Sequence, residues 1–301
     1  MPGGASLEAL LRMKLPVEVR EAVESAVANL ARARGGGATE LPTSETQPLV
    51  RPFGKEATVT LIDTDLKRVY PAQRLFAIDD LPGPLHRQLA LVLYAASVTR
   101  PDLGYVQGMA YVAGMLVAHI PDPYVAYQSL LNMVTTDHMY AFLSMDRSLL
   151  ERFYRLFFSI LKAVEPQTGK VFATRVAEVH PDLYLLPWFQ TIFTKVLPFR
   201  VCARVWDRYL LEGLPALVQA AIALLKGVAL QVSQGGLDEM LAIITSAKHP
   251  AWVAVTAEDA FLRSMGGITL TQQHRGWLAT FGEDPFFYQG TALARTLRRR
   301  G

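Results

Sequence analysis

Apolar residues recur at intervals of three and four through most of this chain, which is the spacing of one face of an α-helix. One such stripe begins beside Pro84, and another ends before Pro166. Further stripes, each closed by a helix-breaking residue, fall at 187–196, 201–211, 214–232 and 237–245. The sequence shows no sustained alternation with a period of two and no Asn-Gly hairpin signal. The pattern therefore predicts an all-α fold.

The breaker residues also predict the order of the parts. Residues 1–34 have helical spacing and are expected to form an N-terminal helical segment. Residues 35–56 are rich in Gly, Pro, Ser and Thr, which is typical of a linker. Because 301 residues exceed the comfortable size of a single core, we expect two lobes, 57–145 and 146–301, the second ending in a short basic tail.

Composition and charge exclude several classes of protein. Hydrophobic residues make up 51% of the chain and charged residues 19%, so it can bury a large core and is not disordered. A net charge of +3 is too small for a nucleic-acid binder that neutralises many phosphates. One basic cluster, Arg295 with 298–300, leaves two interpretations open: a solvated tail, or peripheral contact with an anionic membrane surface.

The sequence gives no sign of secretion or of a membrane span. The first 16 residues lack the basic and apolar regions of a secretory signal. Polar residues interrupt the two longest apolar runs, 105–120 and 216–232, so both predict buried core helices rather than transmembrane segments. The single cysteine, Cys202, lies in an apolar-periodic stretch and is expected to be buried. We expect a soluble, cytoplasmic protein.

Sequence patterns of metalloenzymes and common hydrolases are missing. The six histidines show no H-E-x-x-H spacing, and the chain contains neither G-x-S-x-G nor a Walker-type glycine loop. The pairs Asp137-His138 and His180-Asp182 are interpreted as cap and turn features. We predict no metal site.

A first motif that could carry chemistry runs from Ile62 to Arg68 with the sequence I-D-T-D-L-K-R. On a helix, Ile62, Leu66 and Val69 form a buried stripe, which leaves Asp65 and Arg68 as neighbours on its flank. Taken alone, this pattern is most simply a surface ion pair worth roughly a few tenths of a kcal/mol.

A second motif, R-P-D-L-G-Y-V-Q-G-M, starts at Arg100 and leads into an apolar helix. It is expected to place the amide of Gln107 in the opening turn of that helix. The flanking Gly104 and Gly108 lack side chains and would let another backbone approach closely. Taken alone, this motif is no more than a helix start with a polar side chain.

Together the two motifs resemble the TBC family of Rab GTPase-activating proteins, whose hallmarks are I-x-x-D-x-x-R and Y-x-Q. Here these are Ile62, Asp65 and Arg68, followed by Tyr105 and Gln107. The resemblance continues to Gly213 through a tryptophan-rich helix and an R-x-W-D segment, which here are Trp188 with Phe189 and Phe193, and Arg204, Trp206 and Asp207.

This resemblance implies a two-lobed, multi-helix TBC-type domain that accelerates GTP hydrolysis by a GTP-bound Rab GTPase, with a role in vesicle and membrane traffic. Arg68 would stabilise negative charge on the phosphoryl oxygens, and Gln107 would place the attacking water. Asp65, Tyr105 and Gly108 would position these groups or contact the GTPase. The protein would need no cofactor of its own, because Mg²⁺ and GTP are carried by the GTPase, and we expect a monomer.

The remaining residues of the resemblance are interpreted as structural support for the fold: Ile62, Trp188, Arg204, Trp206 and Asp207. The sequence departs from the family pattern at Val69, where the family often has threonine. A catalytically inactive TBC-like scaffold that binds a GTPase or another partner stays open as the alternative, although the presence of both Arg68 and Gln107 favours activity.

Overall fold

The structure is a computed structural model, and the residues it describes are 56–78, 81–100, 102–246 and 249–281. The predicted N-terminal helices of residues 1–34, nearly all of the predicted linker, and the basic tail lie outside this part of the chain. The two interpretations of the tail therefore stay as predictions.

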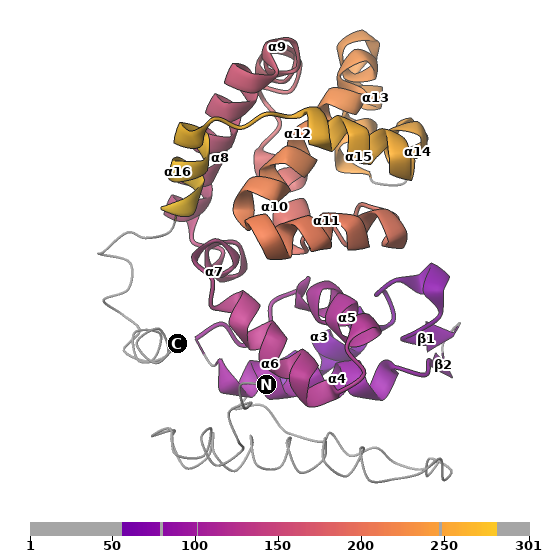
Figure 1. The fold of residues 1–301 in the computed structure, drawn as a ribbon. Helices are drawn as coiled ribbons and strands as arrows, with labels where there is room; N and C mark the ends of the chain where they lie inside the picture. The colour runs from indigo at the N-terminus through magenta and orange to yellow at the C-terminus, as the bar shows by residue number, and fades with distance from the viewer. Residues whose placement is uncertain (1–55, 79–80, 101, 247–248, 282–301) are drawn as a thin grey trace. The chain divides into compact units, whose positions relative to one another are not determined.

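The described residues form an all-α fold, as the helical spacing predicted (Figure 1). The exceptions among them are two short strands, β1 (Ala77–Ile78) and β2 (Leu81–Pro82), which pair antiparallel with Ala77 opposite Pro82. The hydropathy pattern did not predict these strands, because two residues are too few to show an alternation.

The chain divides into two compact units, residues 1–132 and 133–301, and the division lies within α6 (Pro123–Val134). The described elements of the first unit before α6 are α3 (Glu56–Leu66), a 3₁₀ turn at Pro71–Gln73, the strand pair, α4 (His86–Thr99) and α5 (Met109–His119).

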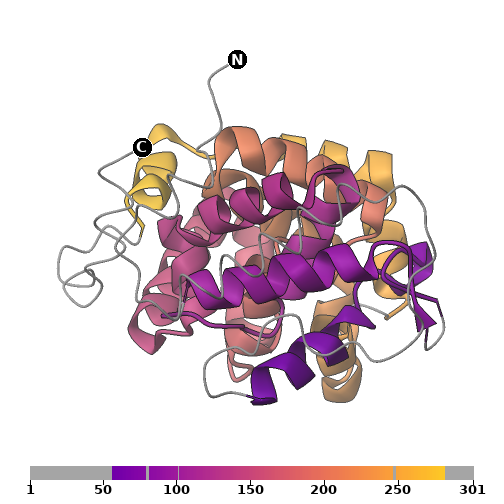
Figure 2. The same cartoon turned by 90° about the horizontal axis from the view of Figure 1, so that it is seen from below.

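Helix α4 is the centre of the first unit. All ten residues from Leu89 to Val98 are buried, so the helix contacts protein all round and not along a single stripe. Helices α3 and α5 pack against α4 and against each other. Figure 2 views this unit from the side on which α3 and α4 lie. The ends of α3 and α5 carry the two motifs of interest, so α4 is the support for both.

The second unit is built round α12 (Leu214–Gln234), which packs against helices on several sides. Its other elements among the described residues are α7 (Asp137–Ser144), α8 (Arg147–Val164), α9 (Pro166–Arg175), a 3₁₀ turn η2 (Pro181–Leu183), α10 (Leu185–Gln190), α11 (Phe199–Glu212), α13 (Leu237–Thr245), α14 (Ala251–Val255), α15 (Glu258–Gly267) and α16 (Gln272–Ala279).

Helix α12 is the one helix in the described part of the chain that is long and apolar enough to cross a membrane, and 67% of its most apolar window is buried within the protein. The buried amide of Gln219 also has protein partners, since it donates to the carbonyl of Ile268 (2.6 Å) and accepts from Arg208 (2.9 Å). Both features are those of a core helix.

One predicted helix is shorter than its apolar pattern suggested. The stripe at 187–196 predicted a continuous helix, but α10 ends at Gln190, and Ile192 and Phe193 take positive φ angles of 48° and 62°. The indole of Trp206 donates to the carbonyl of Ile192 at 3.1 Å, so a tertiary contact fixes this irregular turn. Trp188, Phe193 and Trp206 are all buried.

A partly buried histidine joins α7 to α11. The Nε2 atom of His138 lies 2.7 Å from the hydroxyl of Tyr209, and the two rings meet edge to face. Burial lowers the pKa of His138 to about 4, because surrounding protein disfavours the imidazolium form. A neutral ring can accept the Tyr209 hydroxyl proton at Nε2.

The second unit should therefore lose stability on acidification. The pKa of His138 is depressed from 6.5 to about 4, so the unfolded chain binds more protons between these values. The contribution is present above pH 6.5 and is lost as the pH falls toward 4, and its size is about 3 kcal/mol. His138→Gln keeps an acceptor for Tyr209 but does not titrate, and denaturant unfolding at several pH values should show a flatter profile for the variant. Parallel profiles for the two proteins would contradict this assignment.

Candidate functional site

The first motif, Ile62 to Arg68, is called the arginine motif, and it extends past the end of α3. Ile62, Leu66 and Val69 are buried, as the stripe predicted. The helix ends at Leu66, however, so Arg68 lies in the following turn and not on the helix as the motif suggested, with its amide donating to the carbonyl of Asp65 at 2.9 Å. The chain has left the helical conformation by Tyr70, whose φ of 44° is left-handed. The Arg68 side chain is 59% exposed.

A buried carboxylate connects the two motifs. The side chain of Asp65 is only 5% exposed, and its Oδ2 accepts the hydroxyl of Tyr105 at 2.7 Å across 40 positions of sequence. Its Oδ1 lies 3.8 Å from Nη1 of Arg68. A hydrogen bond to a charged group contributes about 1.5–3 kcal/mol, and losing the donor would leave the carboxylate poorly satisfied. Asp65 therefore holds the start of the glutamine motif against the end of α3.

The tyrosines round this carboxylate stay protonated. Burial, the hydrogen bond to Asp65 and its negative charge all raise the pKa of Tyr105 far above its usual value. Burial and the charge of Asp65 also raise the pKa of Tyr111, against a smaller opposite effect of Arg68. The Tyr105 hydroxyl is thus a permanent donor, and these side chains share one electrostatic environment.

The glutamine motif, which starts at Arg100, carries the side-chain amide of Gln107 on a turn before α5. Helix α5 begins at Met109, so Gln107 lies just before the helix and not in its opening turn as predicted. The reason is Gly108, the residue before the helix, whose φ of 107° is rarely adopted by residues with a side chain. Gly108 is buried and Gln107 is exposed. The turn directs the carboxamide away from the core.

An ion pair that the sequence analysis did not single out closes the beginning of this loop. Arg100 is buried, with Nε and Nη2 donating to the two carboxylate oxygens of Asp102 at 2.9 and 2.7 Å. Burial alone would raise the pKa of Asp102, but the hydrogen bonds and charge of Arg100 lower it. The amide of Gly104 also donates to the carbonyl of Arg100 at 2.7 Å. The spacing of Arg100 and Asp102, two positions apart, was the sequence feature that could have predicted this ion pair.

A further hydrogen bond ties α3 to α4. The hydroxyl of Tyr94, on α4, donates to Oδ1 of Asp63 at 2.8 Å. Burial and the neighbouring carboxylate raise the pKa of Tyr94 above its usual value, so this donor also stays protonated. The helix that carries the arginine motif is thereby fixed to the central helix of the unit.

The predicted supporting residues of the second unit are found in its core and on its surface. Trp188 and Trp206 are buried, whereas Arg204 and Asp207 are exposed and pair along α11 at 2.8 Å. An exposed pair of this kind adds little to stability. Over the described residues, no group of three or more His, Cys, Asp or Glu side chains is arranged to hold a metal ion.

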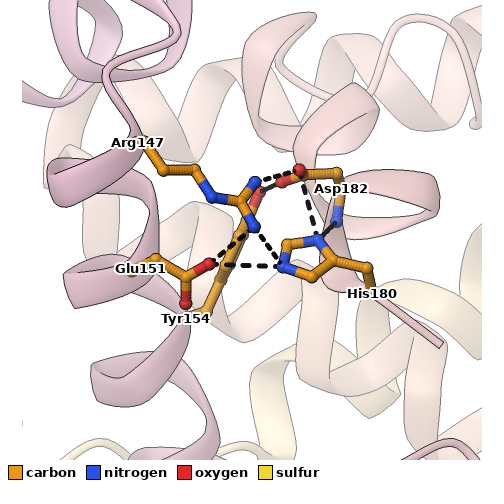
Figure 3. A network of polar contacts seen from close by, with 5 residues as sticks. All are labelled: Arg147, Glu151, Tyr154, His180 and Asp182. Atoms are coloured by element: carbon orange, nitrogen blue, oxygen red, sulfur yellow. Dashed lines mark hydrogen bonds and ion pairs between the residues drawn. The ribbon is translucent and has the colours of Figure 1, made fainter. Parts of the chain in front are cut away.

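A polar cluster of the second unit joins the start of α8 to η2 (Figure 3). Arg147 donates to Asp182 at 2.6 Å and lies 2.8 Å from Nε2 of His180, while Glu151 contacts both Arg147 and His180. Tyr154 donates to the other oxygen of Asp182. The ring of His180 accepts the amide of Asp182, which confirms the prediction of a turn feature. The contacts of this polar cluster connect α8 to η2.

Comparisons with known proteins agree with the motifs. The family model described as Rab-GTPase-TBC domain matches residues 50–230. The chain is 32% identical over 174 residues to TBC1 domain family member 12 of Xenopus tropicalis and 32% identical over 175 residues to TBC1 domain family member 14 of Homo sapiens. Each match covers 57% of this chain and 24% of the relative, so the chain spans about a quarter of the length of these relatives.

Two solved structures share the fold. One, a Chlamydomonas flagellar RabGAP TBC domain, has a TM-score of 0.54 at 20% identity, with 88% of this chain and 84% of that chain covered. The other, the Ypt/Rab-GAP domain of Gyp1p, has a TM-score of 0.56 at 15% identity, with 85% and 84% covered. At these identities the likeness establishes the architecture alone.

The matched segment of 50–230 takes in more than half of the chain, including both motifs and the R-x-W-D segment. Its helices fold as those of the solved TBC domains do. This chain belongs to the Rab-GTPase-TBC domain family.

Proposed function

We propose that this protein activates GTP hydrolysis by a Rab-family GTPase in its GTP-bound form, supplying Arg68 and Gln107 to the partner's nucleotide site. The observation that carries the proposal is the link through Asp65. One buried carboxylate is hydrogen-bonded to Tyr105 and lies beside Arg68, while Arg68 and Gln107 are themselves exposed. Both functional groups are thus accessible to a partner and supported from within.

Arg68 suits the role of an inserted cation. Its guanidinium lies 3.8 Å from Asp65 and is largely solvated, so withdrawing it from that pair costs at most about 1 kcal/mol. In a site from which water is excluded, its planar fork would meet the negative charge that develops on the transferred phosphoryl group. Asp65 keeps the turn in place while the side chain reaches outward.

Gln107 suits the placement of the attacking water. An amide both donates and accepts hydrogen bonds, so it can orient a water molecule without adding negative charge beside the phosphate. Its backbone is fixed from both directions, by the bond of Tyr105 to Asp65 on one side and by Gly108 at the start of α5 on the other. Because the Gln107 backbone is already held in place, less entropy is lost when the reacting groups come together.

The same proposal covers the partner and the setting. Mg²⁺ and GTP would arrive with the GTPase, and the activator would need no cofactor. A Rab substrate places the protein in vesicle and membrane traffic, in the cytoplasm or at a membrane surface, acting as a monomer. A scaffold without catalytic effect is the alternative that the experiments below separate.

Replacing Arg68 by alanine should abolish stimulation. In single-turnover assays with a panel of GTP-loaded Rab proteins, one responsive Rab should hydrolyse GTP faster with the unmodified protein, and Arg68→Ala should reduce that gain by about 10³–10⁵-fold, because the inserted charge is lost. Arg68→Lys should restore little of it, since an ammonium group lacks the fork.

Arg204→Ala is the matched control for this variant. Arg204 has a similar exposed fraction, 60% against 59%, and also pairs with an aspartate three positions away. It should keep the stimulated rate. Rab binding without any acceleration by the unmodified protein would support the scaffold instead.

Gln107→Ala should lower the stimulated kcat by about 10²-fold or more while changing KM for the Rab little, because water placement acts in the transition state. Gln107→Glu should be similarly impaired, since its carboxylate repels the phosphate. Gln273→Ala, at an exposed glutamine of α16, serves as the control. Equal loss in the control, or a purely KM effect at Gln107, would argue against this role.

A further inference from the structure

A glycine inside α5 lies directly against the arginine turn. A Cβ atom added at Gly114 would stand 2.6 Å from Cγ1 of Val69 and 3.4 Å from Cε2 of Phe76. Carbon atoms in favourable contact are about 3.5–4.0 Å apart. The isopropyl group of Val69 therefore occupies the space that any larger residue at position 114 would need.

Val69 cannot yield easily to such an intrusion. It is β-branched, which restricts rotation about χ1, and only 1% of the residue is exposed. Phe76, fully buried, blocks a second direction. In a densely packed core a displaced side chain pushes its own backbone. The backbone beside Val69 is that of Arg68.

Two backbone hydrogen bonds link the turn that carries Arg68 to the end of α3. The amide of Arg68 donates to Asp65 at 2.9 Å, and that of Val69 donates to Leu66 at a long 3.4 Å. Because α3 has already ended at Leu66, a push on Val69 would not be resisted by a continuing helix. The contact with α5 is thus a main determinant of where this turn lies.

We propose that Gly114 is a positioning residue for Arg68: its missing side chain sets how closely the arginine turn approaches α5. The same helix begins at Met109, two residues after Gln107, and Gln107 precedes Gly114 by about two turns. One rigid element would therefore fix the spacing between the two exposed groups. A glycine within a helix is less favourable than alanine, so a steric reason for its presence is required, and Val69 supplies it. This inference rests on the function proposed above.

The test is Gly114→Ala with rescue by Val69→Ala. Using the Rab that responds, Gly114→Ala should lower the stimulated kcat by about 10–100-fold with little change in KM, since a displacement approaching 1 Å costs about this much. The double variant, in which the intruding methyl finds room, should recover most of the loss. Gly276→Ala in α16, where an added Cβ meets nothing within 4 Å, is the control and should keep the stimulated rate.

Hydrogen exchange supplies a readout that is independent of the GTPase. The amides of Arg68 and Val69 should exchange faster in Gly114→Ala than in the unmodified full chain, and should return toward the original rates in the double variant. Unchanged exchange and kcat in Gly114→Ala, or a loss that persists in the double variant, would overturn the inference. If the unmodified chain stimulates no Rab, the proposed function has failed, and the exchange comparison alone decides whether Gly114 sets the turn.

Discussion

The buried carboxylate of Asp65 is the interaction on which the candidate site depends. It accepts a hydrogen bond from Tyr105 and lies beside the guanidinium of Arg68, so it joins a turn after α3 to a loop before α5. A carboxylate at 5% exposure is stable only while its partners stay in place. The hydrogen bond from Tyr105 that stabilises this charge also brings together two segments whose bonded residues are 40 positions apart.

The surrounding structure keeps that arrangement rigid without enclosing it. Arg100 and Asp102 close the loop at one end, and the positive φ of Gly108 closes it at the other. Tyr94 ties α3 to the buried helix α4. Arg68 and Gln107 remain exposed on this framework. A rigid support with accessible ends is what a protein needs if its side chains must act in the site of another protein.

The second unit contributes a different kind of order. Its core is aromatic, and the turn at Ile192 and Phe193 keeps its positive φ angles because Trp206 binds the Ile192 carbonyl. Arg147, His180 and Asp182 tie α8 to η2 by a network of charged and hydrogen-bonded groups. Of the residues that resemble the family in this unit, the buried Trp188 and Trp206 stabilise the fold, whereas the exposed Arg204–Asp207 pair adds little to its stability.

The sequence by itself determined the helical class, most helix positions, the buried stripe of Ile62, Leu66 and Val69, and the two motifs that suggested the family. These features depend on local periodicity and residue type, and both can be seen in a single amino-acid sequence. Only the tertiary structure decided that Arg68 and Gln107 stand in turns outside their helices, that Asp65 lies beside Arg68 and binds Tyr105, and that Val69 packs against Gly114. Where a helix ends, and which distant residues meet, is set by packing and by the need to satisfy buried polar groups, and neither follows from the spacing of residues along the chain.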